Sequence, residues 1–178
     1  MVSVDFFEIT PMRSFSAFIV LSSVSVVLHA AEIGSPADAA SAARTVEIAL
    51  HDNYFEPESI SVAAGETVRF VIDNQGNLLH QFTIATPAMH TAQQAEMAMM
   101  VDHGMLSDTA VDQHAMHMDH GGMEMGEMTH DAPNTVLVEP GQSAELTWTF
   151  PESGTLEYAC NLPGRYDVGM VGELVIQP

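Results

Sequence analysis

The sequence predicts an all-β domain, a Greek-key β-sandwich of about eight strands with one long insert. Short runs of alternating apolar and polar residues, rich in β-branched and aromatic side chains, recur along most of the chain. Turn-forming residues separate these runs at short intervals. At 178 residues the chain suits one domain with a substantial hydrophobic core. We therefore expect two blocks of strands that pack face to face.

The first block contains four predicted strands. They cover residues 45–51, 59–62, 67–73 and 78–85. In the third strand Val68, Phe70 and Ile72 alternate with mostly polar residues, which gives that strand a core face and a solvent face. Turns that contain Gly65 and Gly76 separate the later strands of this block.

The second block contains four more predicted strands. They cover residues 136–138, 144–150, 155–160 and 170–176. Leu146, Trp148 and Phe150 share one face of the second of these strands, and we interpret the single tryptophan as a core residue. Gly141 and Gly154 mark the turns on either side of it.

The first 31 residues are typical of a secretory signal peptide. An apolar run, residues 15–28, follows Arg13, and the small residues Ala30 and Ala31 provide a position suited to signal-peptidase cleavage. The run is shorter than the roughly 20 apolar residues that a membrane anchor needs. We predict that residues 1–31 are removed on export, which makes the mature protein periplasmic with no membrane span.

The beginning of the chain leaves two possibilities for the start of translation. Acidic residues before Met12 do not suit the positively charged start of a signal peptide, so translation begins either at Met1 or at Met12. Residues 32–44 are small and polar, and we predict that they form a flexible lead-in. The folded domain is then expected to span residues 45–178.

The composition excludes some classes of partner. There are 24 acidic residues against four arginines and no lysine, for a formal net charge of −20. Such a surface repels nucleic-acid phosphates and anionic lipid, so we expect no nucleic-acid binding. It raises the local concentration of cations, although solubility or adaptation to salt explains the same composition equally well.

The only cysteine, Cys160, and a lone methionine, Met170, flank one short loop. The strand 155–160 delivers Cys160 to this loop, and the strand 170–176 leaves it. A single cysteine in an exported chain cannot form an internal disulfide, so it is a free thiol, an intermolecular bridge or a metal ligand. Thiolate and thioether sulfurs are soft ligands, and this favours a copper site.

The loop resembles the C-terminal ligand loop of the cupredoxins, most closely that of the small periplasmic copper-resistance cupredoxins. Residues 160–170 read Cys-Asn-Leu-Pro-Gly-Arg-Tyr-Asp-Val-Gly-Met, and the family pattern is Cys-Asn-x-Pro-Gly-His-Tyr-x-x-Gly-Met. The resemblance covers both blocks of strands and implies a cupredoxin sandwich with copper as its cofactor. It also implies that His80 is a ligand beside Cys160 and Met170. Arg165 stands where the family has its second histidine ligand, and a guanidinium offers no lone pair to a metal.

Residues 87–133, between the two blocks, form an insert of different composition. They contain ten methionines, six histidines and eight acidic residues but no lysine or arginine. The first part is predicted to be a helix that Thr86 caps, with Pro87 in its first turn. On that helix Met97 and Met100 are interpreted either as contacts with the sandwich or as metal ligands. The insert as a whole is expected to be partly helical or disordered.

The later part of the insert, residues 114–130, has neither a helical nor a strand period. Thioethers select Cu(I) and imidazoles bind copper or zinc, so we predict that this tract captures copper. The alternatives are a disordered linker and an adaptable surface for a partner protein. The candidate ligands of the insert are His90, His114, Met116, His117, Met118, His120, Met123, Met125, Met128 and His130. His90 is also the candidate to replace the missing histidine of the core site.

These residues predict a periplasmic copper-binding protein for copper tolerance or delivery. Without a second imidazole, a site of His80, Cys160 and Met170 favours Cu(I), and the positive charge of Arg165 adds to this bias. One alternative is a blue-copper electron-transfer protein that takes a replacement ligand from the insert. Another is a sandwich whose core site is inactive while the insert binds metal. Besides copper ions, the candidate partners are a periplasmic copper exporter, an oxidase or a redox protein.

We expect no enzymatic activity. The sequence contains no nucleophile paired with a general base, no phosphate-binding loop and no zinc-protease motif. By resemblance, copper oxidases and nitrite reductases need several cupredoxin domains with further histidine clusters, and this chain has one domain and one cysteine.

Overall fold

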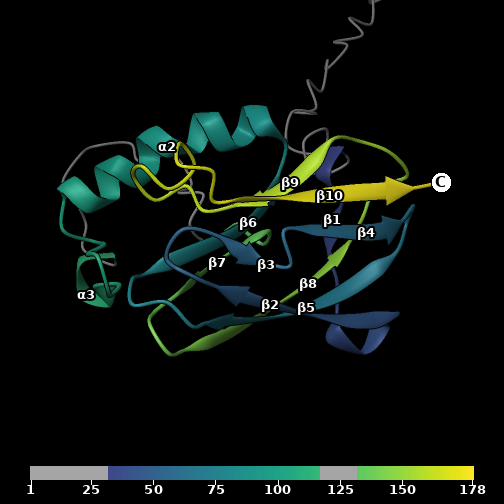
Figure 1. Cartoon of the computed structure of the whole chain (residues 1–178), viewed down its shortest axis with the longest axis horizontal. Helices are drawn as coiled ribbons and strands as arrows, with labels where there is room; N and C mark the ends of the chain where they lie inside the picture. Colours follow the sequence, from purple (N-terminus) through teal and green to yellow (C-terminus); the bar gives the residue numbers. More distant parts are fainter. Residues whose placement is uncertain (1–31, 117–131) are drawn as a thin grey trace, which may run out of the picture.

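The computed structural model describes residues 32–116 and 132–178, which form ten strands in two sheets of five. Figure 1 shows the two sheets packed as a sandwich, with the helices α2 and α3 toward one end. The strands are β1 Ser35–Pro36, β2 Arg44–Leu50, β3 Phe55–Glu56, β4 Ser59–Ala63, β5 Thr67–Asn74, β6 His80–Ala85, β7 Thr135–Val138, β8 Ser143–Thr149, β9 Leu156–Ala159 and β10 Val171–Gln177. The predicted all-β sandwich is confirmed, and the two-residue strands β1 and β3 are additions to it.

The first sheet has the strand order β1-β8-β5-β2-β3. Its central strand, β5, runs parallel to β2 and antiparallel to β8, with Phe70 opposite Leu146. Val68, Phe70 and Ile72 are fully buried, as the alternation in the sequence predicts. Trp148 of β8 is also buried, which confirms its interpretation as a core residue.

The second sheet has the strand order β4-β10-β9-β6-β7. β10 runs parallel to β4 and antiparallel to β9, and β6 lies between β9 and β7. Because β6 and β9 are antiparallel, with Thr83 opposite Ala159, the start of β6 and the end of β9 meet at one end of the sheet. This end of the sandwich carries the candidate ligands.

Residues 32–44 differ from the flexible lead-in that the sequence predicts, because they contact the sandwich. β1 pairs with β8, with Ser35 opposite Thr149. The indole N–H of Trp148 donates to the carbonyl oxygen of Ile33 at 2.7 Å, and the Ile33 side chain is buried. A buried indole needs an acceptor. That acceptor lies 115 residues away along the chain, so local sequence patterns do not reveal it.

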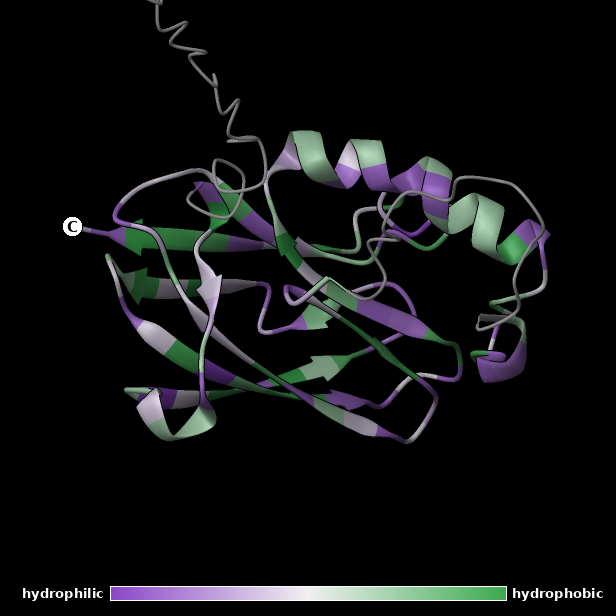
Figure 2. Ribbon diagram, turned by 180° about the vertical axis from the view of Figure 1, so that it is seen from behind, coloured by the Kyte–Doolittle hydropathy of each residue, from purple (hydrophilic) through white to green (hydrophobic). Residues whose placement is uncertain are grey.

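Helix α2, Pro87–Asp102, is the helix that the sequence predicts in the insert. The Thr86 side chain accepts a hydrogen bond from the Met89 N–H at 3.3 Å, which completes the predicted cap. Figure 2 shows hydrophobic and hydrophilic residues mixed along this helix. Its buried residues are His90, Gln93, Met97 and Met100. The burial of both methionines favours the packing interpretation for them.

A second, shorter helix of the insert, α3, comprises Gln113–Met116. Within residues 32–116 and 132–178, no helix combines the length and the apolar character needed to span a membrane.

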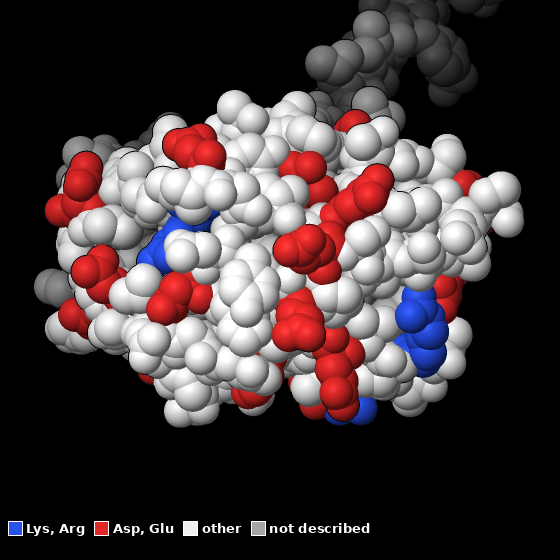
Figure 3. Space-filling view, viewed as in Figure 1, with Lys and Arg blue, Asp and Glu red and all other residues white. Residues whose placement is uncertain are grey.

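Acidic side chains are spread over the surface. Figure 3 shows them scattered across the displayed face, with few basic side chains between them. Arg44 donates to Glu66 at 2.7 Å, and Arg69 donates twice to Glu145, at 3.0 and 2.5 Å. The two basic side chains are therefore already paired, and the surface keeps a strong excess of negative charge.

Candidate metal centre

The loop between β9 and β10 brings Cys160 and Met170 to one place. Cys160 directly follows β9, and Met170 directly precedes β10. These strands are antiparallel, with Val171 opposite Ala159, and the Cys160 N–H donates to the Met170 carbonyl oxygen at 3.2 Å. Opposite residues of an antiparallel pair point to the same face. Both side chains are fully buried, so the thiol and the thioether lie inside the same end of the sandwich.

His80 begins β6 at this same end. The backbone N–H of Gln81, the next residue, donates to the sulfur of Cys160 at 3.4 Å. The His80 side chain is also fully buried. The fold therefore gathers the three predicted core ligands, His80, Cys160 and Met170, at one end of the second sheet.

The two nitrogens of the His80 ring have different surroundings. Its Nε2 atom lies 3.4 Å from Oδ1 of Asp52, and the same carboxylate accepts hydrogen bonds from Asn77 at 2.8 and 3.2 Å. Its Nδ1 atom is buried and has no hydrogen-bond partner among the described residues. A buried nitrogen without a partner is costly, and metal-bound histidines commonly direct their other nitrogen to a carboxylate. The residues therefore fit a metal ion at Nδ1.

Burial sets the protonation of both donor groups. It lowers the pKa of His80, with a contribution in the same direction from the charge of Arg165, whereas Asp52 raises that pKa. The imidazole is therefore neutral at pH 7, as metal binding requires. Burial raises the pKa of the Cys160 thiol, although the Gln81 amide and Arg165 oppose this. A bound cation would reverse the balance, because a coordinating thiol gives up its proton.

Arg165 links the ligand loop to the support of His80. Its Nη1 donates to the backbone carbonyl oxygen of Asp52, the residue whose carboxylate contacts the His80 ring. Within the described ranges, Arg44 and Arg69 pair with carboxylates, whereas Arg165 forms no ion pair. Because a guanidinium cannot coordinate a metal, Arg165 supplies positive charge and a structural link rather than a donor atom.

Two glycines allow the ligand loop to turn tightly. Gly164 and Gly169 have φ angles of +77° and +91°, a region that favours glycine. In the same loop the Met170 N–H donates to the Arg165 carbonyl oxygen at 3.0 Å, and the Gly169 N–H donates to the Tyr166 carbonyl oxygen, also at 3.0 Å. The loop is therefore closed by its own backbone, which fixes Met170 relative to Cys160.

His90 lies on helix α2 and contacts the residue that follows Cys160. Its Nδ1 is 3.0 Å from the side-chain oxygen of Asn161, and its Nε2 is 3.4 Å from the carbonyl oxygen of Glu157. The ring of Tyr166 stacks on it at a centroid distance of 5.6 Å. Coordination of a metal by either nitrogen of His90 would break one of these contacts.

The remaining predicted ligands of the insert are only partly described. His114 is exposed on α3, and Met116 ends that helix. The others, His117, Met118, His120, Met123, Met125, Met128 and His130, lie outside the described residues. In the part of the chain that the structure covers, no group of three or more histidine, cysteine and acidic side chains forms a metal cluster. A centre at His80 and Cys160 therefore depends on the thioether of Met170 as its third donor.

Sequence reasoning missed the residues that support the candidate ligands. Gln81 follows His80, and Asn161 follows Cys160, so their position next to a candidate ligand was the available signal. Asp52 offered no such signal, because it precedes His80 by 28 residues and reaches it only through the fold.

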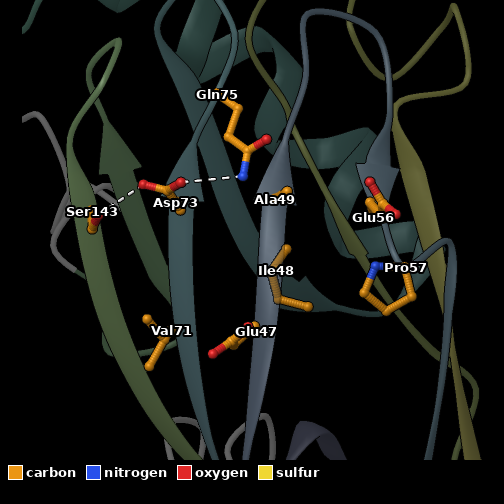
Figure 4. Close-up of a pocket in the computed structure, with 9 residues that line it drawn as sticks. All are labelled: Glu47, Ile48, Ala49, Glu56, Pro57, Val71, Asp73, Gln75 and Ser143. Atoms are coloured by element: carbon orange, nitrogen blue, oxygen red, sulfur yellow. Dashed lines mark hydrogen bonds between the residues drawn. The ribbon is translucent and has the colours of Figure 1, made fainter.

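Figure 4 shows a groove of about 650 Å³ on the side of β2 and β5 that faces away from the core. Carboxylates of Glu47, Glu56 and Asp73 line it. Asp73 accepts hydrogen bonds from Gln75 at 3.3 Å and from Ser143 at 2.9 Å. None of the nine lining residues carries a sulfur atom or an imidazole, so this groove offers no soft ligand.

Comparison with known proteins agrees with this geometry. Residues 18–101 match the family described as cupredoxin-like domain. The chain is 52% identical to the copper-resistant cuproprotein CopI of Pseudomonas aeruginosa, over 84% of this chain and 85% of that protein. It is 37% identical to the protein of the same name from Rubrivivax gelatinosus, over 81% of this chain and 73% of that protein. The structure of auracyanin B has a similar fold, with a TM-score of 0.57 and 23% identity over 82% of this chain and 96% of that chain.

Proposed function

The chain belongs to the copper-resistant cuproproteins and contains a cupredoxin-like domain, and we propose that it binds copper in the periplasm for copper tolerance or delivery. The identity of 52% with one such protein, over most of both chains, carries the family assignment. Membership confirms the resemblance seen in residues 160–170, and it makes copper the cofactor of this domain. The observation that carries the site is the buried Nδ1 of His80, which lacks a partner among the described residues, while the N–H of the next residue, Gln81, donates to the Cys160 sulfur.

The core site holds Cu(I) through His80, Cys160 and Met170. One imidazole and two sulfurs give Cu(I) a suitable three-coordinate environment, whereas Cu(II) lacks a second nitrogen donor. Arg165 adds a positive charge close enough to lower the pKa of His80, and it has no carboxylate partner in the described ranges. A nearby positive charge disfavours Cu(II) more than Cu(I), so it strengthens the bias.

The insert, residues 87–133, captures copper for the core site. The five methionines and four histidines of residues 114–130 supply thioether and imidazole donors, and the acidic surface raises the local concentration of cations. Residues 1–31 act as the export signal for the domain that follows. In this proposal the chain is a binding protein rather than an enzyme, and its protein partner is a periplasmic copper exporter, an oxidase or a redox protein.

Electron transfer is the alternative function, and the fold of the relatives favours it by analogy. It requires a fourth ligand that stabilises Cu(II). His90 can serve only if its ring turns away from the Asn161 side-chain oxygen or the Glu157 carbonyl, because each ring nitrogen faces one of these oxygens. Because electron transfer needs this rearrangement, we favour copper binding for tolerance or delivery over electron transfer.

Titration of the mature protein with Cu(I), and separately with Cu(II), tests the proposal. We expect tight, colourless Cu(I) binding, with one equivalent fewer in Cys160→Ala. With Cu(II) we expect only weak visible absorption. An unchanged stoichiometry in Cys160→Ala would assign all copper to the insert, and intense colour with Cu(II) would favour electron transfer.

A further inference from the structure

Helix α2 turns polar side chains into the interior, where an ordinary packing helix would place apolar ones. His90 is fully buried and Gln93 is 9% exposed, both on the side of the helix that also buries Met97. Buried polar groups are costly unless they find hydrogen-bond partners. The hydrogen-bond partners of His90 and Gln93 therefore indicate which part of the protein this face of the helix contacts.

Both polar side chains bind the same residue, Asn161. The Asn161 side-chain amide donates to Oε1 of Gln93 at 2.8 Å, and its oxygen lies 3.0 Å from Nδ1 of His90. Asn161 is fully buried and directly follows Cys160. Two side chains about one helical turn apart thus hold Asn161, the residue after Cys160 in the ligand loop.

The same helix also reaches the residue that follows His80. The side-chain amide of Gln81 donates to the sulfur of Met97 at 3.6 Å, and its oxygen accepts from the backbone N–H of Asn161 at 3.1 Å. The backbone N–H of Gln81 donates in turn to the sulfur of Cys160 at 3.4 Å. The contacts form one buried chain from the helix to the candidate thiolate ligand.

We propose that helix α2 is a positioning element of the copper site, and that Gln93, His90 and Met97 act through Asn161 and Gln81 rather than as ligands. The helix holds Asn161 in place, and Asn161 with Gln81 keeps an amide hydrogen bond aimed at the Cys160 sulfur. The first part of the insert is thereby joined to the core site by hydrogen bonds. The inference about copper rests on the proposed function, whereas the positioning of the loop does not.

Amide hydrogen exchange in the metal-free protein tests the positioning directly. Gln93→Leu removes the acceptor for the Asn161 side chain, and we expect the backbone amides of Asn161 and Gln81 to exchange about tenfold faster. The amide of Phe70, in the other sheet, should keep its rate and so report that the fold is intact. The matched control is Gln94→Leu, which removes the same amide group from the neighbouring, half-buried position.

If Gln93→Leu accelerates exchange throughout the protein, Met97→Leu replaces it as the probe. This change conserves volume and removes only the sulfur acceptor, so it should accelerate Asn161 and Gln81 about threefold. Equal exchange at Asn161 in the variants of Gln93, Met97 and the control position would overturn the proposal.

Competition with a Cu(I) chelator gives the second readout. We expect Gln93→Leu to weaken Cu(I) binding at the Cys160 site about tenfold, and Gln94→Leu to change it less than twofold. Faster exchange with unchanged affinity would overturn the role in positioning copper. If the parent protein binds no Cu(I) at Cys160, the proposed function fails, while the exchange data still decide whether α2 holds the loop.

Discussion

His80 and His90 are both fully buried imidazoles beside the ligand loop, yet their nitrogen atoms have different surroundings. Nδ1 of His80 has no partner among the described residues, whereas both nitrogens of His90 lie within hydrogen-bond distance of oxygen atoms. Burial lowers the pKa of both residues, so neither exposure nor pKa separates them. The nitrogen without a partner separates them, and on this difference we propose His80 as the ligand and His90 as a structural residue.

The largest expected effect is that of His80→Leu on copper binding. We expect Cu(I) affinity at the Cys160 site to fall by about 100-fold or more, since loss of residues that merely support a ligand already costs roughly 10- to 100-fold. The free energy of unfolding of the metal-free protein should change by less than about 1 kcal/mol, because Nδ1 has no described partner and the partly exposed carboxylate of Asp52 keeps its hydrogen bonds from Asn77 when Nε2 is lost. Chelator competition and urea unfolding measure the two quantities. If His80→Leu binds Cu(I) at the Cys160 site as tightly as the parent, His80 is not a ligand and does not differ from His90 in this respect.

The second prediction concerns the ligand that the loop lacks. Arg165→His should give an intense visible absorption with Cu(II) that the parent lacks, because a second imidazole completes the donor set that Cu(II) prefers. Arg165→Gln is the control, since it removes the charge and the contact with the Asp52 carbonyl without supplying an imidazole. Equal colour in both variants would mean that charge, rather than the missing donor, controls the site.

The third prediction concerns His90, which we expect to affect stability rather than the number of bound copper ions. His90→Leu should lower the free energy of unfolding by about 2 kcal/mol, because the ring donates its one N–H to the side-chain oxygen of Asn161 or to the Glu157 carbonyl, and the change leaves that acceptor without this partner. The copper stoichiometry should stay unchanged, although the affinity weakens. Thr91→Ala, an exposed position on the same helix, is the control for both measurements. Loss of one copper equivalent in His90→Leu would identify His90 as a ligand after all.

The contrast between the two histidines also shows what the sequence can and cannot predict. Eight of the ten strands, the cap at Thr86 and the loop from Cys160 to Met170 depend on neighbouring residues, so alternation, turn residues and spacing were sufficient to predict them. The hydrogen bonds that distinguish His80 from His90 join residues 28 and 71 positions apart. Such partners are set by how strands and helices pack, and no local pattern encodes them.

The smallest expected effect is the pH dependence that His90 contributes to stability. Burial lowers the pKa of folded His90 below the ordinary histidine value of 6.5, although the Glu157 carbonyl, the Asn161 side chain and the Glu157 charge oppose this. A group with a lowered folded pKa binds its proton more readily in the unfolded chain, so its contribution is present above pH 6.5 and is lost as the pH falls. The stability difference between the parent and His90→Leu should therefore narrow as the pH falls below 6.5. Urea unfolding of the metal-free proteins at pH 7.5, 6.5 and 5.5 measures this, with Thr91→Ala expected to show a constant difference. A difference that widens toward acid would mean that the folded protein stabilises the imidazolium, with Glu157 and the stacked ring of Tyr166 as the nearby groups that face it.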